Sequence, residues 1–212
     1  MRKSLPAIFA LSAVLALSAC GGSGSGSQTP LTNAPQTPPN VDVPQTSPIV
    51  FVQSNFVGPA VQGITAVSWG TPFETDVNGR FEYRVDDNVT FWLGGIALGT
   101  AAGEALMSPV SLAGAQGTIE SNVATNVARF LQTLDEDADV SNGIMISATV
   151  TAAAEQLTLD FTVAPEAFEA SNLTQYALAV LTPLTAGSHG SVMPLVSVEQ
   201  ARAAYAAAIA SK

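Results

Sequence analysis

The chain has 212 residues, which is enough for one ordinary domain once any targeting segment is removed. Seven Lys and Arg against 17 Asp and Glu give a formal net charge of −10, so the chain lacks the clustered cations that a nucleic-acid binder needs. Hydrophobic residues make up 47% of the chain and charged residues 11%, which excludes a disordered acidic polymer. One Cys and one His exclude a disulfide framework and a Cys/His zinc site.

The first 19 residues have the pattern of a secretory signal peptide. Met1-Arg2-Lys3 provides a cationic start, and residues 5–19 are an unbroken run of apolar and small residues. A run of this length makes about 22 Å of helix, which is shorter than the roughly 30 Å hydrocarbon core of a membrane. The sequence therefore predicts a cleaved signal over residues 1–19 and not a membrane span.

The end of this run, Leu17-Ser18-Ala19-Cys20, resembles the lipobox of bacterial lipoproteins. In that family the Cys sulfur receives a diacylglyceryl group, cleavage precedes the Cys, and the new amine is acylated. The resemblance implies that Cys20 is the first mature residue and that its acyl chains, such as palmitate, hold the protein on a membrane. Gly21, not Asp, follows the Cys, which for a Gram-negative cell implies the outer membrane. An incidental Cys in an ordinary signal and a reactive thiol are the two alternatives.

Residues 20–48 are predicted to be the acylated Cys and a tether. Gly and Ser dominate residues 21–27, and six Pro punctuate residues 30–48, where Asp42 is the single charge. Such a segment spans about 29 Å as a flexible coil and roughly 87 Å if fully extended as polyproline. We expect it to hold the folded part clear of the lipid surface.

Residues 49–212 are predicted to form a single β-rich domain. Alternation of apolar and polar residues predicts short strands over 61–68, 81–85, 89–93 and 96–98. Turn signals separate these strands, at Asp76-Val77-Asn78-Gly79, at Asp86-Asp87-Asn88 and at Gly94-Gly95. This spacing is typical of an antiparallel meander or sandwich.

The second half of the domain mixes helices with strands. An apolar stripe predicts a helix over 122–134, and alternation predicts strands over 144–150 and 157–163. Asn172 with Gln175 is predicted to cap a helix that Pro183 ends, and Ser197 with Gln200 forms a capping box for a terminal helix to residue 209. The predicted fold class is α+β, an antiparallel β-meander or sandwich with helices packed in the C-terminal half.

Four segments resemble a module of secreted and lipid-anchored bacterial proteins. They are residues 75–83, 89–95, 126–135 and 142–144, and the similarity covers most of residues 61–209. The first hairpin is also similar to the carboxypeptidase-regulatory, transthyretin-like β-sandwich. The resemblance implies an accessory role at the cell surface and supplies neither an activity nor a substrate.

The densest charge cluster follows the predicted helix over 122–134. Asp135, Asp137 and Asp139 match the opening spacing of a calcium loop, and Asn142 offers a further oxygen. Val140 and Ile146 stand where an EF-hand needs Gly and the closing Glu, so the segment is not an EF-hand. Two interpretations stay open: a short Ca²⁺ loop that Asn142 and backbone oxygens close, and a solvated acidic turn.

His189 and the two Trp residues are the other candidates for a site. His189 lies in a Gly/Ser loop and is the only available base for a nucleophilic Ser, but no Gly-x-Ser-x-Gly elbow accompanies it. The sequence therefore predicts no catalytic residue. Trp69 and Trp92 are candidates for a sugar-stacking platform, and packing within the fold is the alternative.

Taken together, these patterns predict a lipid-anchored protein of the bacterial cell envelope that is not an enzyme. Its expected role is a binding, adhesion or scaffold module whose partner is an envelope protein or a glycan. An accessory subunit or chaperone for an envelope or secreted protein is the alternative, and a hydrolase is a third. Ca²⁺ is the only cofactor that the sequence suggests, and no nucleic acid is expected as a partner.

Overall fold

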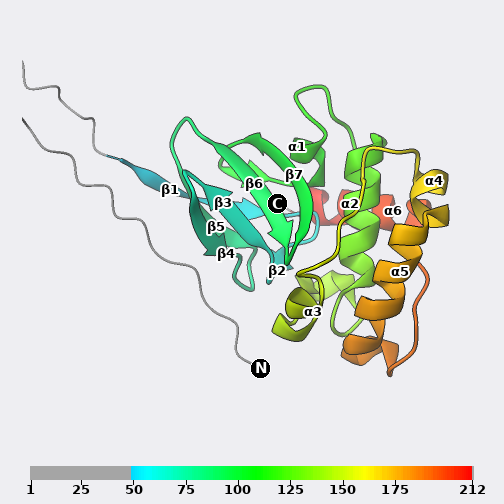
Figure 1. Cartoon of the computed structure of the whole chain (residues 1–212). Helices are drawn as coiled ribbons and strands as arrows, with labels where there is room; N and C mark the ends of the chain where they lie inside the picture. The colour runs from blue at the N-terminus through cyan, green and yellow to red at the C-terminus, as the bar shows by residue number, and fades with distance from the viewer. Residues whose placement is uncertain (1–48, 212) are drawn as a thin grey trace, which may run out of the picture. The chain divides into compact units, whose positions relative to one another are not determined.

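The computed structural model describes residues 49–211, in which a β-rich part and a group of helices pack together (Figure 1). The predicted signal peptide, Cys20 and the tether over 20–48 lie outside the described residues.

The strands form two main sheets and one short pair. The three-stranded sheet has the order β5-β1-β8, with β1 antiparallel to β5 and parallel to β8. The four-stranded sheet is antiparallel throughout and has the order β4-β3-β6-β7, and β2 pairs with β9 in parallel. The strands are β1 Phe51–Phe56, β2 Val61–Gln62, β3 Thr65–Ser68, β4 Thr71–Glu74, β5 Arg80–Arg84, β6 Asn88–Leu93, β7 Ile96–Ala102, β8 Leu106–Met107 and β9 Ile144–Met145.

Aromatic side chains join the two main sheets. The ring of Phe91 in β6 lies 4.6 Å from the ring of Phe56 in β1 and 5.2 Å from the ring of Phe81 in β5, centroid to centroid. All three rings are buried, and the alternation that predicted strands over 81–85 and 89–93 places Phe81 and Phe91 on the inner faces. The core of the β-rich part therefore lies between the sheets.

Six α-helices and three 3₁₀ helices are found in the described part of the chain, mostly in its C-terminal half, which confirms the α+β class. No helix within residues 49–211 is long and apolar enough to span a membrane. The α-helices are α1 Pro109–Leu112, α2 Asn122–Thr133, α3 Ala148–Ala153, α4 Pro165–Ala170, α5 Asn172–Leu181 and α6 Val198–Ala210. The 3₁₀ helices are η1 Val140–Asn142, η2 Thr182–Leu184 and η3 Ala186–Ser188.

Helix α2 is the centre of the helical part, and every residue over 124–133 is buried. Its apolar stripe packs into the core, where the ring of Phe130 lies 5.7 Å from that of Phe161. Its polar face is covered too. Arg129, only 2% exposed, donates from Nε to the Val196 carbonyl at 2.7 Å and from Nη2 to Glu169 Oε2 at 2.6 Å. The stripe predicted the helix, and the second layer over its polar side was not predicted.

Helix α6 lies against α2 and reaches the end of β1 (Figure 1). It begins with the predicted capping box, because the Ser197 side chain accepts from the Gln200 N–H and the Gln200 side chain accepts from the Ser197 N–H. The ring of Tyr205 occupies the space that a side chain at Gly58 would need, and its hydroxyl lies 3.4 Å from Ser108 Oγ. This contact ties the last helix to the turns that follow β1 and β8.

Several predicted elements differ from the structure. The strand over 61–68 is interrupted at Gly63, so β2 and β3 are separate. The strand over 144–150 is wrong beyond β9, because Ser147 caps α3 through its side chain. The segment 157–163 forms no strand.

Helix α5 has Ser171 and not Asn172 at its N-cap, and Gln175 donates to the Glu169 carbonyl. The helix ends where expected, since Pro183 lies in η2.

Candidate functional site

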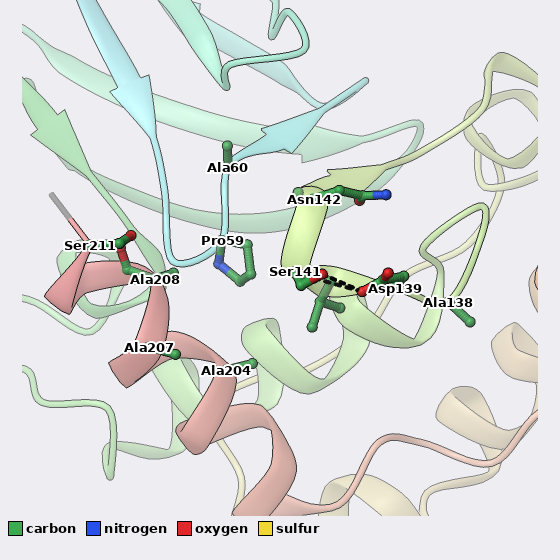
Figure 2. Close-up of a pocket in the computed structure, with 12 residues that line it drawn as sticks. Pro59, Ala60, Ala138, Asp139, Ser141, Asn142, Ala204, Ala207, Ala208 and Ser211 are labelled. Carbon is green, nitrogen blue, oxygen red and sulfur yellow. Dashed lines mark hydrogen bonds between the residues drawn. The ribbon is translucent and has the colours of Figure 1, made fainter.

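The predicted calcium loop connects α2 to β9, and its exposed carboxylates bind their own loop. Asp137 accepts from the Asp139 backbone N–H at 2.9 Å and from the Asn142 amide at 2.9 Å. Asp139 accepts from the N–H and the hydroxyl of Ser141, and Figure 2 shows the hydroxyl contact. Hydrogen bonds from Asn142 and from the Asp139 backbone keep the pKa of Asp137 below its usual range. The loop therefore brings Asp137 and Asn142 together, with Asp139 turned to Ser141.

Asp135 has a different environment from the rest of the loop. Its side chain is 2% exposed; Oδ1 accepts from the Met145 N–H at 2.9 Å, and Oδ2 is buried with no hydrogen-bond donor. Burial raises the pKa of Asp135 from 3.8 to about 6; the Met145 hydrogen bond opposes the rise, and the negative charge of Asp137 adds to it. Asp135 and Asp137 therefore form a carboxyl pair with opposite pKa shifts.

Glu136 fastens the same loop to the helical part. Its N–H donates to the Met145 carbonyl at 2.9 Å, and its carbonyl accepts from the Gly187 N–H at 2.7 Å. Within residues 49–211, no group of three or more His, Cys, Asp and Glu side chains is arranged to hold a metal ion. Of the calcium ligands that the sequence suggests, the described structure therefore brings the carboxylates of Asp135 and Asp137 together, whereas Asp139 is bonded to Ser141.

Two neighbouring hollows lie on either side of the contact between η1 and α6, and we call them together the α6 groove. The larger has a volume of about 550 Å³ and the smaller about 410 Å³, and both are lined by Ala138, Val140 and Ala204. Figure 2 shows the larger hollow between the loop at Pro59, η1 and the small side chains of α6. Met193 and Pro194 line the smaller hollow, and Asp139 and Asn142 lie on the rim of the larger one.

The groove was not predicted from the sequence. Its floor is made of Ala204, Ala207 and Ala208 and of Gln200, which repeat at helical spacing in an Ala-rich segment. That repeat predicts that these side chains share one face of a helix. It does not predict that a hollow separates this face from η1. The acidic loop is the part of this region that the sequence identified.

The two Trp residues do not form one platform. Trp92 pairs with Thr65 at the start of β3 and is half-buried, whereas Trp69 follows the end of β3 and is 58% exposed. The guanidinium carbon of Arg84 lies 3.7 Å from the centre of the Trp69 ring. Trp69 is thus an exposed, stacked side chain on the β3–β4 turn, and Trp92 belongs to the sheet.

His189 is an exposed residue that ends η3 with φ 50°. The hydroxyl of its neighbour Ser188 is buried and donates to the Thr185 carbonyl. Among the residues described, no side chain is hydrogen-bonded to the imidazole of His189. The structure therefore does not bring His189 together with a nucleophile or an orienting carboxylate.

Comparison of the chain with protein-family models, with curated proteins and with solved structures found no match.

Proposed function

We propose that the protein is a lipid-anchored protein of the bacterial cell surface that acts without catalysis, as a binding module for another polypeptide. The anchor rests on the lipobox-like segment ending at Cys20 and on the Gly-, Ser- and Pro-rich residues that follow it. The binding role rests on the α6 groove. This groove is the observation that carries the proposal.

The lining of the α6 groove favours a polypeptide partner over a glycan. None of its lining residues is aromatic, and most of them are Ala, Val, Met and Pro. Sugar sites rely on exposed aromatic rings, whereas small apolar side chains allow another helix or strand to approach closely. Val192, which precedes Met193, is 59% exposed and extends the apolar surface.

The charge of the domain indicates what the partner carries. Residues 49–211 contain sixteen Asp and Glu against four Arg, and Asp137 and Asp139 are exposed beside the groove. A partner with an apolar strip flanked by Lys or Arg is complementary to this surface. An accessory subunit or a chaperone for an envelope or secreted protein uses the same groove, so both roles share one test.

The anchoring part is tested by the mass of the mature protein. Expression in a bacterial host that processes lipoproteins should give a chain that begins at Cys20 and carries acyl groups, and that chain should fractionate with membranes. Cys20→Ser should leave an unacylated precursor. An unmodified mature chain, or equal membrane association of the variant, would contradict the anchor.

The binding part is tested by photo-crosslinking on intact cells. A photoreactive residue at Ala207, which lies in the groove, should give one discrete protein adduct. The same residue at Ala170, which is also exposed and lies at the end of α4, is the matched control. Adding Ala204→Arg should abolish the adduct by filling the groove. Equal labelling from both positions would contradict a groove-specific partner.

A further inference from the structure

The floor of the α6 groove is one face of a helix that runs under both hollows. Six uncharged residues of α6 and its C-cap line the hollows, separated by three or four positions along the chain, so their side chains share a face. They are Gln200, Ala203, Ala204, Ala207, Ala208 and Ser211. The smaller hollow lies over the first part of this face and the larger over the last part, where Figure 2 shows the Ala side chains.

No strand edge borders the groove. In the described part of the chain, none of the residues that line either hollow belongs to a β-strand. At the smaller hollow, the Met193 N–H donates to Thr182 Oγ1 at 2.9 Å and the Val196 N–H donates to Thr133 Oγ1 at 3.0 Å. Pro194, between them, has no N–H. This wall therefore has no row of backbone donors with which an added strand could pair.

The walls of the larger hollow are closed in the same way. Pro59 has no N–H, and the Ala60 carbonyl accepts from the first N–H of β9 at 2.7 Å. In η1, the N–H groups of Ser141 and Asn142 both donate to Asp139. An extended segment in this groove would leave its own backbone groups unpaired against apolar side chains. A polypeptide that fills the groove must satisfy its backbone internally, which an α-helix does.

The two hollows are spaced for two turns of such a helix. Gln200 lines only the smaller hollow and Ala207 only the larger, and seven residues of α6 rise about 10.5 Å. A second helix lying along α6 presents side chains at i and i+7 with the same separation. An extended segment covers this distance in about three residues. The volumes of about 410 and 550 Å³ give each hollow room for a large apolar side chain.

Carboxylates lie near both ends of the groove. Asp139 is on the rim of the larger hollow, and Glu199 is exposed beside Gln200 at the smaller one. Because the floor itself is uncharged, these flanks favour Lys or Arg on the occupant. A second copy of this chain would bring sixteen Asp and Glu against four Arg in residues 49–211, so its surface repels the rim.

We propose that the α6 groove takes an amphipathic helix of the partner protein, which lies along α6 and inserts two large apolar side chains seven residues apart, one into each hollow. Lys or Arg residues flank these two anchors. This inference rests on the proposed binding function and specifies which kind of segment the groove recognises.

Photo-crosslinking from two positions measures the shape of the bound segment. The full-length chain carries a photoreactive residue at Gln200 in one variant and at Ala207 in another, and the adducts formed on intact cells are mapped by mass spectrometry. We expect the centres of the two adduct distributions to lie about seven residues apart in one partner protein. A separation of about three residues would mean an extended segment and would overturn the helix.

A synthetic peptide that covers the mapped segment gives a second readout with the purified full-length protein. Its helical circular dichroism should increase on binding, and Pro midway between the anchors should weaken binding at least tenfold, whereas Ala there should not. Ala207→Leu should also weaken binding at least tenfold by filling the larger hollow. Ala206→Leu, at an exposed position that lines neither hollow, should leave binding unchanged. Equal effects of the two Leu variants, or binding without a gain of helix, would overturn the inference.

The outcomes separate this inference from the proposed function. No discrete protein adduct from either position would contradict the binding function and, with it, this inference. A discrete partner whose adducts lack the helical separation would leave the function in place and overturn the helix alone. Adducts on a second copy of this chain would also overturn the inference, because it assigns the groove to a different polypeptide with basic flanks.

Discussion

The Met145 N–H donates to Asp135 Oδ1 at 2.9 Å, while the second oxygen of the same carboxyl is buried without a donor. Oδ1 of Asp135 thus has a hydrogen-bond donor in β9. Oδ2 has none, so ionising the carboxyl in this buried position costs free energy. Burial, and to a smaller extent the neighbouring charge of Asp137, raises the pKa of Asp135 to about 6, so the folded state favours its protonated form below that pH.

The first prediction concerns the pH dependence of stability. The folded pKa of Asp135 is about 6 against an ordinary 3.8, so its favourable contribution is complete below pH 3.8 and is lost as the pH rises through 6. Asp135→Asn keeps the acceptor for Met145 and removes the charge. We expect it to raise the free energy of unfolding at pH 7.5 by up to about 3 kcal/mol, with no gain at pH 3.5.

Urea denaturation in the presence of EDTA measures this effect. Asp160→Asn is the control, because hydrogen bonds from Thr162 lower the pKa of the exposed Asp160, and the stability it contributes is lost as the pH falls. Its effect should therefore have the opposite sign at pH 7.5. Parallel pH profiles for wild type and Asp135→Asn would show that Asp135 is charged at no cost.

The second prediction concerns Arg129. Arg129→Met removes the donors to the Val196 carbonyl, the Pro165 carbonyl and Glu169, and leaves the two part-buried carbonyls without these hydrogen bonds. We expect the free energy of unfolding to fall by about 3 kcal/mol or more. Glu169→Gln should cost less than about 1 kcal/mol, because Glu169 is 53% exposed and Gln still accepts a hydrogen bond. Equal losses of unfolding free energy from the two variants would mean that the ion pair with Glu169, and not the hydrogen bonds to the carbonyls, provides the stabilisation by Arg129.

The third prediction concerns Gly63, which has φ 86° and lies against the Ile146 carbonyl. A Cβ at Gly63 would lie 2.2 Å from that oxygen, so Gly63→Ala must separate β2 from β9. We expect a loss of about 2–4 kcal/mol. Gly70 has φ 70° with open space around it, so Gly70→Ala should lose only about 1 kcal/mol from backbone strain. Thermal unfolding of both variants measures the two losses. A larger loss for Gly63→Ala shows the cost of the contact with the Ile146 carbonyl, whereas equal losses would mean that backbone strain alone accounts for both.

The fourth prediction concerns calcium. If a Ca²⁺ ion binds between Asp135 and Asp137, it replaces the proton that the pair favours, so the midpoint of thermal unfolding should rise with Ca²⁺ over chelator at pH 7.5 and hardly change at pH 5. Asp137→Asn should remove the rise. Identical midpoints with Ca²⁺ and with chelator at both pH values would count against a calcium loop and favour a solvated acidic turn.

Much of the fold could be predicted where one local pattern decides one element. The stripe over 122–134 and the capping box at Ser197 and Gln200 predicted α2 and α6 to within a residue or two. The alternation over 81–85 and 89–93 predicted the inward rings of Phe81 and Phe91. In each case the side-chain period and the backbone hydrogen bonds lie within the same short segment.

The wrong predictions occurred where the alternation of apolar and polar residues indicates which side chains are buried but does not indicate whether the backbone pairs with another strand. Over 157–163 the odd-numbered side chains are indeed the more buried ones, yet the backbone has no partner strand. After Ile144 and Ile146, the hydroxyl of Ser147 starts a helix where alternation predicted more strand. The α6 groove could not be predicted from the sequence for the same reason. The size of a hollow depends on the distance between η1 and α6, which neither segment's sequence determines alone.

The contact between Tyr205 and Gly58 joins segments that are far apart in the chain. If the chain is exported N-terminus first, as the proposed signal peptide implies, β1 would emerge long before α6. The space beside Gly58 would then stay open, and the covering of α2 incomplete, until the last residues emerge. The closing contact of the fold would form only when synthesis and export are nearly complete.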